Sequence, residues 1–68
     1  MPYYCMNKNA QNTGDHEVHD KTCQFVPKPE NQLDLGYHPS CHGAVAKAKQ
    51  INPMADGCKF CSPQCHKR

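Results

Sequence analysis

The last part of the chain concentrates side chains that bind metals or undergo redox chemistry. Cys58, Cys61, Cys65 and His66 lie close together in the stretch DGCKFCSPQCHKR. The spacing Cys58-x2-Cys61 is typical of a zinc knuckle, in which a tight turn directs two thiolates at one ion. Gly57 directly before this pair suits the sharp start of such a turn. Because a tetrahedral ion needs four ligands, the pair requires two more from elsewhere in the chain.

A second pair with chelating spacing, His19-x3-Cys23, lies far upstream. Joining the two pairs around one ion would connect distant parts of the chain, and Cys₃His is a common structural ligand set for zinc. The sequence therefore predicts one Zn²⁺ held by His19, Cys23, Cys58 and Cys61. The main alternative replaces His19 by Cys41, which would give a Cys₄ site.

Other uses of these cysteines fit the spacing less well. A c-type haem site requires C-x-x-C-H, whereas His66 follows Cys65 and not Cys61. A thioredoxin-like redox motif requires a βαβ context, which the chain lacks, and no ferredoxin spacing matches Cys58, Cys61 and Cys65. A disulfide framework stays open because the chain has six cysteines, an even number. The absence of a recognisable secretory signal favours zinc over disulfides.

The length and composition of the chain indicate why such a cross-link is needed. The 68 residues allow one domain, residues 1–68, and only 37% of them are hydrophobic. A domain of this size has a marginal core and usually depends on a metal, disulfides or a partner subunit. We expect a cytoplasmic location, because no signal peptide and no apolar stretch of membrane-spanning length is visible. We also expect a monomer with no membrane contact.

The charge pattern offers little to a nucleic acid. The net charge is +2, and a nucleic-acid-binding domain normally carries a clustered basic face. Lys47, Lys49, Lys67 and Arg68 are the candidate contacts. For Lys47 and Lys49 we favour the simpler interpretation of a solvated helix face.

Residue patterns predict an α+β fold that would position the metal ligands. Short strands are expected at residues 2–6, 16–19 and 32–37, with turn-forming residues between the first two. A helix is expected over 41–51, because Ser40 is a good N-cap and Pro53 prevents continuation. Ser62-Pro63 predicts a short final helical turn. The expected architecture is a three-stranded antiparallel sheet packed on the helix and held together by zinc.

The other cysteines and histidines have simpler interpretations. The predicted helix places Cys41, Ala44, Val45, Ala48 and Ile51 on one apolar face. A buried thiol at Cys41 behaves there as a small hydrophobe. Cys65 would pack beside Cys41 or form a disulfide with it on oxidation, and Cys5 would pack in the first strand. The four remaining histidines are expected to face solvent: His16, His38, His42 and His66.

Residues 17–63 resemble the metal-binding domain of the Ada DNA-repair protein and its wider superfamily. The shared pattern is a ligand-x3-Cys pair, a strand, an Ala-rich helix, and a Gly before C-x-x-C followed by Pro. Here its ligand positions are His19, Cys23, Cys58 and Cys61. The chain also resembles a set of short bacterial proteins that end in GCxxCSxxCH. In Ada a cysteine at the first ligand position accepts a methyl group from DNA. His19 stands at that position here, so we expect no methyl transfer.

These observations predict a small zinc-stabilised binding or structural module that is not an enzyme. The first alternative is a nucleic-acid-associated module of Ada-like type. The second is a thiol redox protein that uses Cys58 and Cys61. The residue pattern does not specify a partner.

Overall fold

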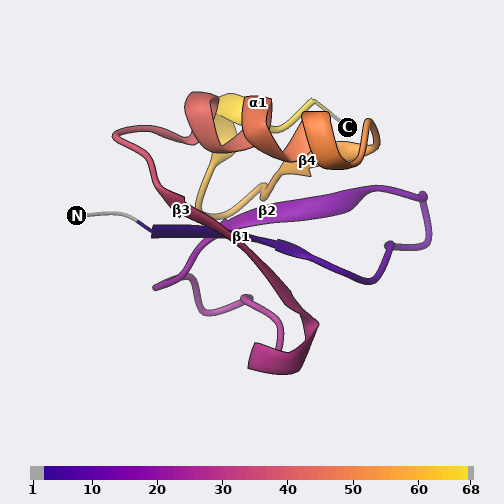
Figure 1. The fold of residues 1–68 in the computed structure, drawn as a ribbon. Helices are drawn as coiled ribbons and strands as arrows, with labels where there is room; N and C mark the ends of the chain where they lie inside the picture. Colours follow the sequence, from indigo (N-terminus) through magenta and orange to yellow (C-terminus); the bar gives the residue numbers. More distant parts are fainter. Residues whose placement is uncertain (1–2, 68) are drawn as a thin grey trace.

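The computed structural model describes residues 3–67, which form an α+β fold with a sheet covered on one face by a helix (Figure 1). The strands are β1 (Tyr3–Asn7), β2 (His16–Asp20), β3 (Gln32–Tyr37) and β4 (Ala55–Gly57). The helix α1 spans Cys41–Ile51, and short 3₁₀ helices η1 and η2 span Pro29–Asn31 and Pro63–Cys65. Within the described residues, no helix has the length and apolar character needed to cross a membrane.

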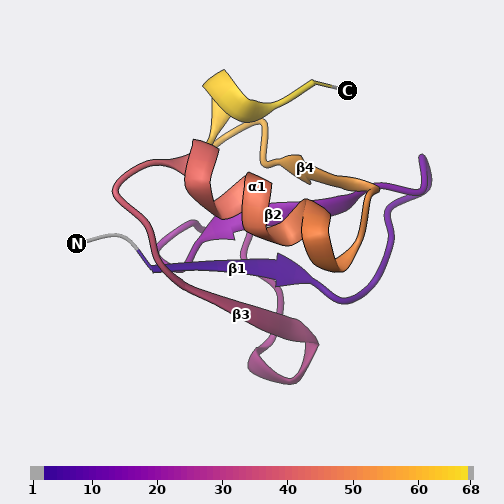
Figure 2. The same ribbon diagram turned by 45° about the horizontal axis from the view of Figure 1, so that its top comes forward.

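The sheet has four strands in the order β3-β1-β2-β4, and it is mixed. β1 pairs antiparallel with β2 and with β3, whereas β4 pairs parallel with β2 (Figure 2). The three predicted strands pair antiparallel as expected, but the prediction missed β4, which makes the sheet four-stranded and mixed. The sequence of β4, Ala-Asp-Gly, is short and lacks the β-branched and aromatic residues by which strands are recognised. It becomes a strand because the chain leaving α1 returns alongside β2.

The other predicted elements are confirmed. The strand over 32–37 and the helix over 41–51 have the expected bounds, and the final helical turn is η2. The first two strands each extend one residue further than predicted, and residue 2 lies outside the described part of the chain. Ser40 occupies the N-cap position with extended backbone, although its side chain makes no capping hydrogen bond within residues 3–67.

The core lies between α1 and the sheet and is built mainly from small side chains. The helix contributes Cys41, Ala44 and Ala48, all nearly inaccessible to solvent. Val18 and Leu35 fill the opposite side, with Tyr4, Met6, Ala55 and Cys65 around them. Ile51 was expected on the buried face but is 55% exposed. It is the last helical residue, directly before the chain turns toward β4.

A glycine with positive φ shapes the pairing of β3 with β1. Gly36 has φ of 81°, a conformation that other residues rarely adopt. The register shifts at this point, so that Tyr4 pairs with Gly36 while Cys5 pairs with Asp34. The residue between them, Leu35, is 1% exposed and belongs to the core.

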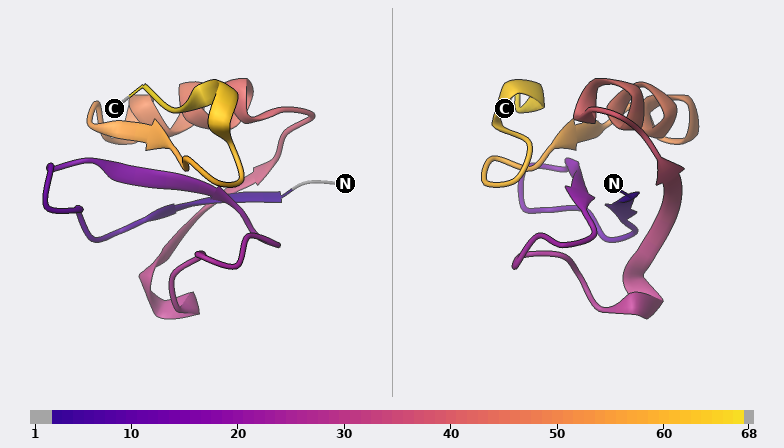
Figure 3. Two further views of the ribbon diagram at one scale, coloured as in Figure 1. Left: turned by 180° about the vertical axis from the view of Figure 1, so that it is seen from behind. Right: turned by 90° about the vertical axis from the view of Figure 1, so that its left-hand side faces the viewer.

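A disulfide joins the start of α1 to η2, near the end of the chain. Cys41 at the start of α1 is bonded to Cys65 in η2, with 24 residues of sequence separation. Figure 3 shows η2 beside the first turn of the helix. The sequence left this bond as one option for the pair. On a chain-entropy model, closing a loop of this size stabilises the fold by about 3 kcal/mol.

The packing of η2 against β4 requires a glycine at position 57. A Cβ atom on Gly57 would lie 2.7 Å from the Cβ of Cys65 and 2.8 Å from its carbonyl carbon. These distances are too short for non-bonded carbon atoms, and Cys65 is held in place by its disulfide. The sequence suggested a sharp turn as the reason for this glycine, whereas the structure gives close approach between two segments.

We predict that Gly57→Ala destabilises the fold by about 1–3 kcal/mol, the usual cost of inserting a methyl group into filled space. The control is Gly43→Ala, at an exposed helical glycine where a Cβ would lie 3.1 Å from a side-chain atom of His38 and would have only atoms of that side chain as its nearest neighbours outside the helix. Urea denaturation of both variants measures the difference. Equal stability of Gly57→Ala and the parent chain would show that η2 moves away without penalty.

Candidate metal centre

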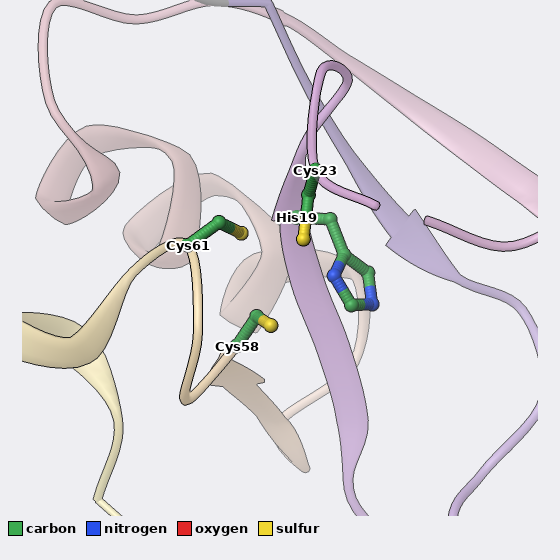
Figure 4. A group of neighbouring side chains, drawn as sticks. All are labelled: His19, Cys23, Cys58 and Cys61. Carbon is green, nitrogen blue, oxygen red and sulfur yellow. The ribbon is translucent and has the colours of Figure 1, made fainter. Parts of the chain in front are cut away.

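Four side chains from two distant parts of the chain meet at one point beside the sheet (Figure 4). One potential ligand atom from each of His19, Cys23, Cys58 and Cys61 lies within 4.8 Å of all the others. The structure thus brings together the residues in which the sequence predicted a metal site. His19 and Cys58 are buried, and Cys23 and Cys61 are half-buried.

The parallel pairing of β4 with β2 creates this meeting point. Val18 pairs with Gly57, and the N–H of Cys58 donates to the carbonyl oxygen of Val18 at 2.9 Å. Cys58 therefore leaves the sheet directly beside His19, the residue after Val18. Without β4, the C-x-x-C loop would have no fixed position relative to β2.

Tight turns direct the cysteine side chains inward. After β2, the N–H of Cys23 donates to the carbonyl of Asp20 at 2.9 Å and reverses the chain. After β4, the N–H of Ser62 donates to the carbonyl of Cys58 at 2.9 Å. Each turn thereby places its cysteine toward the same point, as Figure 4 shows.

Backbone N–H groups also point at two of the sulfur atoms. The N–H of Phe60 donates to Cys58 Sγ and the N–H of Asp20 donates to Cys61 Sγ, both at 3.4 Å. Such donors favour a negatively charged sulfur. The second of these bonds links the β2 turn to the C-x-x-C loop, so the two halves of the site support each other.

The imidazole of His19 is oriented as a metal ligand would be. Its Nε2 lies 3.4 Å from Oε1 of Glu17. Its Nδ1 is buried and has no hydrogen-bond partner among the described residues, and the ring nitrogen next to Cγ faces the sulfur atoms in Figure 4. A buried polar atom without a partner is costly, and a bound cation would remove that cost. Ligating histidines commonly present their other nitrogen to a carboxylate in this way.

Burial favours the neutral forms of His19, Cys58 and Cys61. Burial lowers the pKa of His19, and the nearby carboxylate of Glu17 opposes this only in part. Burial also raises the pKa of the Cys58 and Cys61 thiols. A neutral imidazole is ready to bind a cation, whereas the two thiols must first lose their protons. Metal binding would therefore release protons and strengthen as pH rises.

Two further cysteines lie outside this group. Cys41 was the alternative to His19, but it is bonded to Cys65 and does not belong to the four-residue group. Cys5 pairs directly across from His19 in the β1–β2 register. It is fully buried, and burial raises its pKa to about 11. This agrees with the packing role expected from the sequence.

The prediction of solvent-facing histidines was correct for His42 alone. The other three are partly buried, and each has a carbonyl oxygen within hydrogen-bonding distance. His16 contacts the carbonyl of Asn7 at 3.0 Å, His38 that of Leu35 at 2.8 Å, and His66 that of Gly57 at 3.0 Å.

Sequence reasoning missed the role of Glu17. It precedes His19 by two residues, which places both side chains on one face of a strand. That period of two, in a strand already predicted, is the signal by which the contact between them could have been found.

Comparisons with known proteins do not assign a function, so any assignment rests on the geometry of the site. The chain matches no protein-family model, no curated protein and no solved structure.

Proposed function

We propose that this chain is a small structural or binding module that holds one Zn²⁺ through His19, Cys23, Cys58 and Cys61. The observation that carries the proposal is the convergence of four ligand atoms within 4.8 Å of one another. The buried, unpartnered Nδ1 of His19 adds to it, because this atom needs a partner that a cation would provide.

The ligand chemistry favours zinc among the common metals. Thiolate and imidazole ligands suit zinc and other soft or borderline ions, whereas calcium and magnesium prefer oxygen. Three thiolates and one neutral imidazole around Zn²⁺ give a site with a charge of about −1 and four protein ligands. Such a closed site is typical of a structural role, because a catalytic zinc keeps one position for water or substrate.

The fold gains from a cross-link at this place. β4 has three residues, and its pairing with β2 ends at Val18. An ion bound to both β2 and the loop after β4 would hold that short pairing closed. Because the site does not exist in the unfolded chain, the binding free energy would contribute to folding.

The same geometry favours a module over a methyl acceptor or a redox enzyme. His19 lacks the nucleophilic sulfur that the resemblance to Ada would require at its position. A redox-active C-x-x-C pair depends on a lowered thiol pKa, whereas burial raises the pKa of both Cys58 and Cys61.

A second candidate function, binding of single-stranded nucleic acid, draws support from an exposed aromatic pair. Phe25 and Phe60 are 49% and 66% exposed, and their ring centroids lie 4.6 Å apart. They belong to the two loops that carry the cysteine ligands, and the exposed Lys59 lies beside Phe60 in the sequence. Exposed aromatic rings near lysines are the usual platform for unpaired bases.

The lysines that the sequence named as candidate nucleic-acid contacts do not form one group around the aromatic pair. Lys49 and Lys67 line the same pocket near η2. Lys47 lies near Asp34, whose pKa is lowered mainly by the Gly36 N–H and by Lys21 and least by Lys47. Arg68 lies outside the described residues. The aromatic pair is thus the better supported contact for a nucleic acid.

We predict one zinc ion per chain in protein purified without chelators, measured by native mass spectrometry and elemental analysis. His19→Ala should lower zinc affinity by more than the roughly 10- to 100-fold that loss of an outer hydrogen-bond partner costs. His16→Ala is the matched control, because His16 lies on the same strand and outside the group. A strong chelator should reduce amide signal dispersion in β2, β4 and the following loop. Protein that contains no transition metal would contradict the proposal.

Removal of the carboxylate behind His19 should weaken binding without removing a ligand. We expect Glu17→Ala to lower zinc affinity about 10- to 100-fold, as measured by competition with a chromophoric chelator. Glu30→Ala, at an exposed acidic residue in η1, serves as the control. Equal affinities in the two variants would mean that Glu17 does not orient the imidazole.

The second candidate function predicts binding of a single-stranded oligonucleotide that weakens with added salt. Phe60→Ala should lower the affinity about tenfold or more, in line with the energy of stacking on one base. Tyr37→Ala is the control, because Tyr37 is 42% exposed and belongs to another aromatic pair, with Tyr3. Fluorescence anisotropy measures both. An absence of binding at low salt would eliminate this function.

A further inference from the structure

A second group of metal-binding side chains lies apart from the four-residue site. Cys41, His42 and Cys65 each place a ligand atom within 4.8 Å of the others. Two of them are joined as a disulfide, and the third is exposed on the surface of α1. None of the three belongs to the group formed by His19, Cys23, Cys58 and Cys61.

We propose that Cys41, His42 and Cys65 form a second metal site, for one thiophilic ion such as Zn²⁺ or Cu(I), when the disulfide is reduced. Two thiolates and an imidazole are ligands that both ions accept. The same two sulfur atoms then have two mutually exclusive states, one bonded to each other and one bonded to the ion.

Contacts other than the disulfide also hold these three side chains near one another. Cys41 and His42 are consecutive in the first turn of α1, and Cys41 belongs to the buried core. Cys65 is held in η2 by its backbone N–H bond to Ser62 and by its close packing on Gly57. Reduction therefore removes one bond between segments that other contacts also hold, and leaves the two thiols next to His42.

A small pocket adjoins this group on the side of His42 and Cys65. The pocket has a volume of about 130 Å³ and is lined by His42, Val45, Lys49, Gln64, Cys65 and Lys67. Because three protein ligands leave a tetrahedral zinc one position short, the pocket provides room for a water molecule or an exchangeable ligand. The second site would thus have one open coordination position, whereas the four-residue group has none.

A dithiol reductant and the incoming ion together convert the disulfide state into the metal-bound state. Cleavage of the sulfur–sulfur bond takes two electrons and two protons from a dithiol reductant, which is itself oxidised to a disulfide. The ion then displaces the two thiol protons to solvent and forms two metal–sulfur bonds and one bond to a ring nitrogen of His42. Release of the ion and oxidation by a disulfide reverse the sequence.

The test compares the metal content of the oxidised and reduced protein. The disulfide is reduced with a phosphine, which is oxidised to its oxide and removed before titration with Zn²⁺ or, separately, Cu(I). We expect the reduced chain to bind one ion more than the oxidised chain in native mass spectra, for at least one of these two metals. The readout is the difference, so it stays valid whether or not the four-residue group holds an ion.

Two variants assign the extra ion to this place. His42→Ala should weaken its binding by more than about tenfold, since loss of even an outer hydrogen-bond partner of a ligand costs about 10- to 100-fold, and should leave any ion in the four-residue group unaffected. Lys49→Ala, which changes the same pocket without removing a ligand, should bind both ions as the parent chain does. His42 and Lys49 are both exposed on α1, so neither substitution disturbs the core.

Three results would overturn the proposal. The first is an equal number of ions in the oxidised and reduced chains for both metals. The second is an extra ion whose affinity does not change in His42→Ala. The third is unfolding on reduction that neither metal reverses, which would make the disulfide a purely structural cross-link.

Discussion

The parallel pairing of β4 with β2 is the contact on which the rest of this structure depends. It involves only three residue pairs, from His16 with Ala55 to Val18 with Gly57. Those pairs nevertheless set the position of Cys58 beside His19 and lead the chain into the turn that carries Cys61. They also bring η2 against the sheet edge, where Gly57 leaves room for Cys65. One short ladder therefore positions both the four-residue group and the disulfide.

The composition of the core explains why so short a ladder needs support. Val18 and Leu35 are the fully buried branched aliphatic side chains among the described residues, and each contributes about 1.5–3 kcal/mol by burial. Most of their neighbours are alanines and cysteines, which bury little area. Larger apolar side chains such as Phe25, Ile51 and Phe60 remain exposed. Hydrophobic burial alone is thus weak for a chain of this length, in keeping with the general marginality of small domains.

Covalent and polar contacts compensate at the C-terminal end. The disulfide joins η2 to the start of α1. The buried carboxylate of Asp56 accepts hydrogen bonds from the N–H of Lys67 at 3.0 and 3.2 Å and lies 3.3 Å from Nδ1 of His66. These contacts hold the segment after Cys61 at its C-terminal end, at His66 and Lys67. A metal held by the four-residue group would hold the same segment at its other end, at Cys61.

Local patterns in the sequence determined much of this protein. Alternation of apolar residues located the strand over 32–37, and a cap, an apolar stripe and a proline located the helix over 41–51. Chelating spacings selected His19, Cys23, Cys58 and Cys61, because two ligands near each other in sequence are recognisable without knowledge of the fold. Tertiary structure alone decided what depends on contacts between distant segments. Ala55–Gly57 is a strand only because β2 lies beside it, and Gly57 is required only because Cys65 packs on it. The same reason applies to the contact of His66 with the carbonyl of Gly57, since a residue's neighbours across the fold leave no mark in its local sequence.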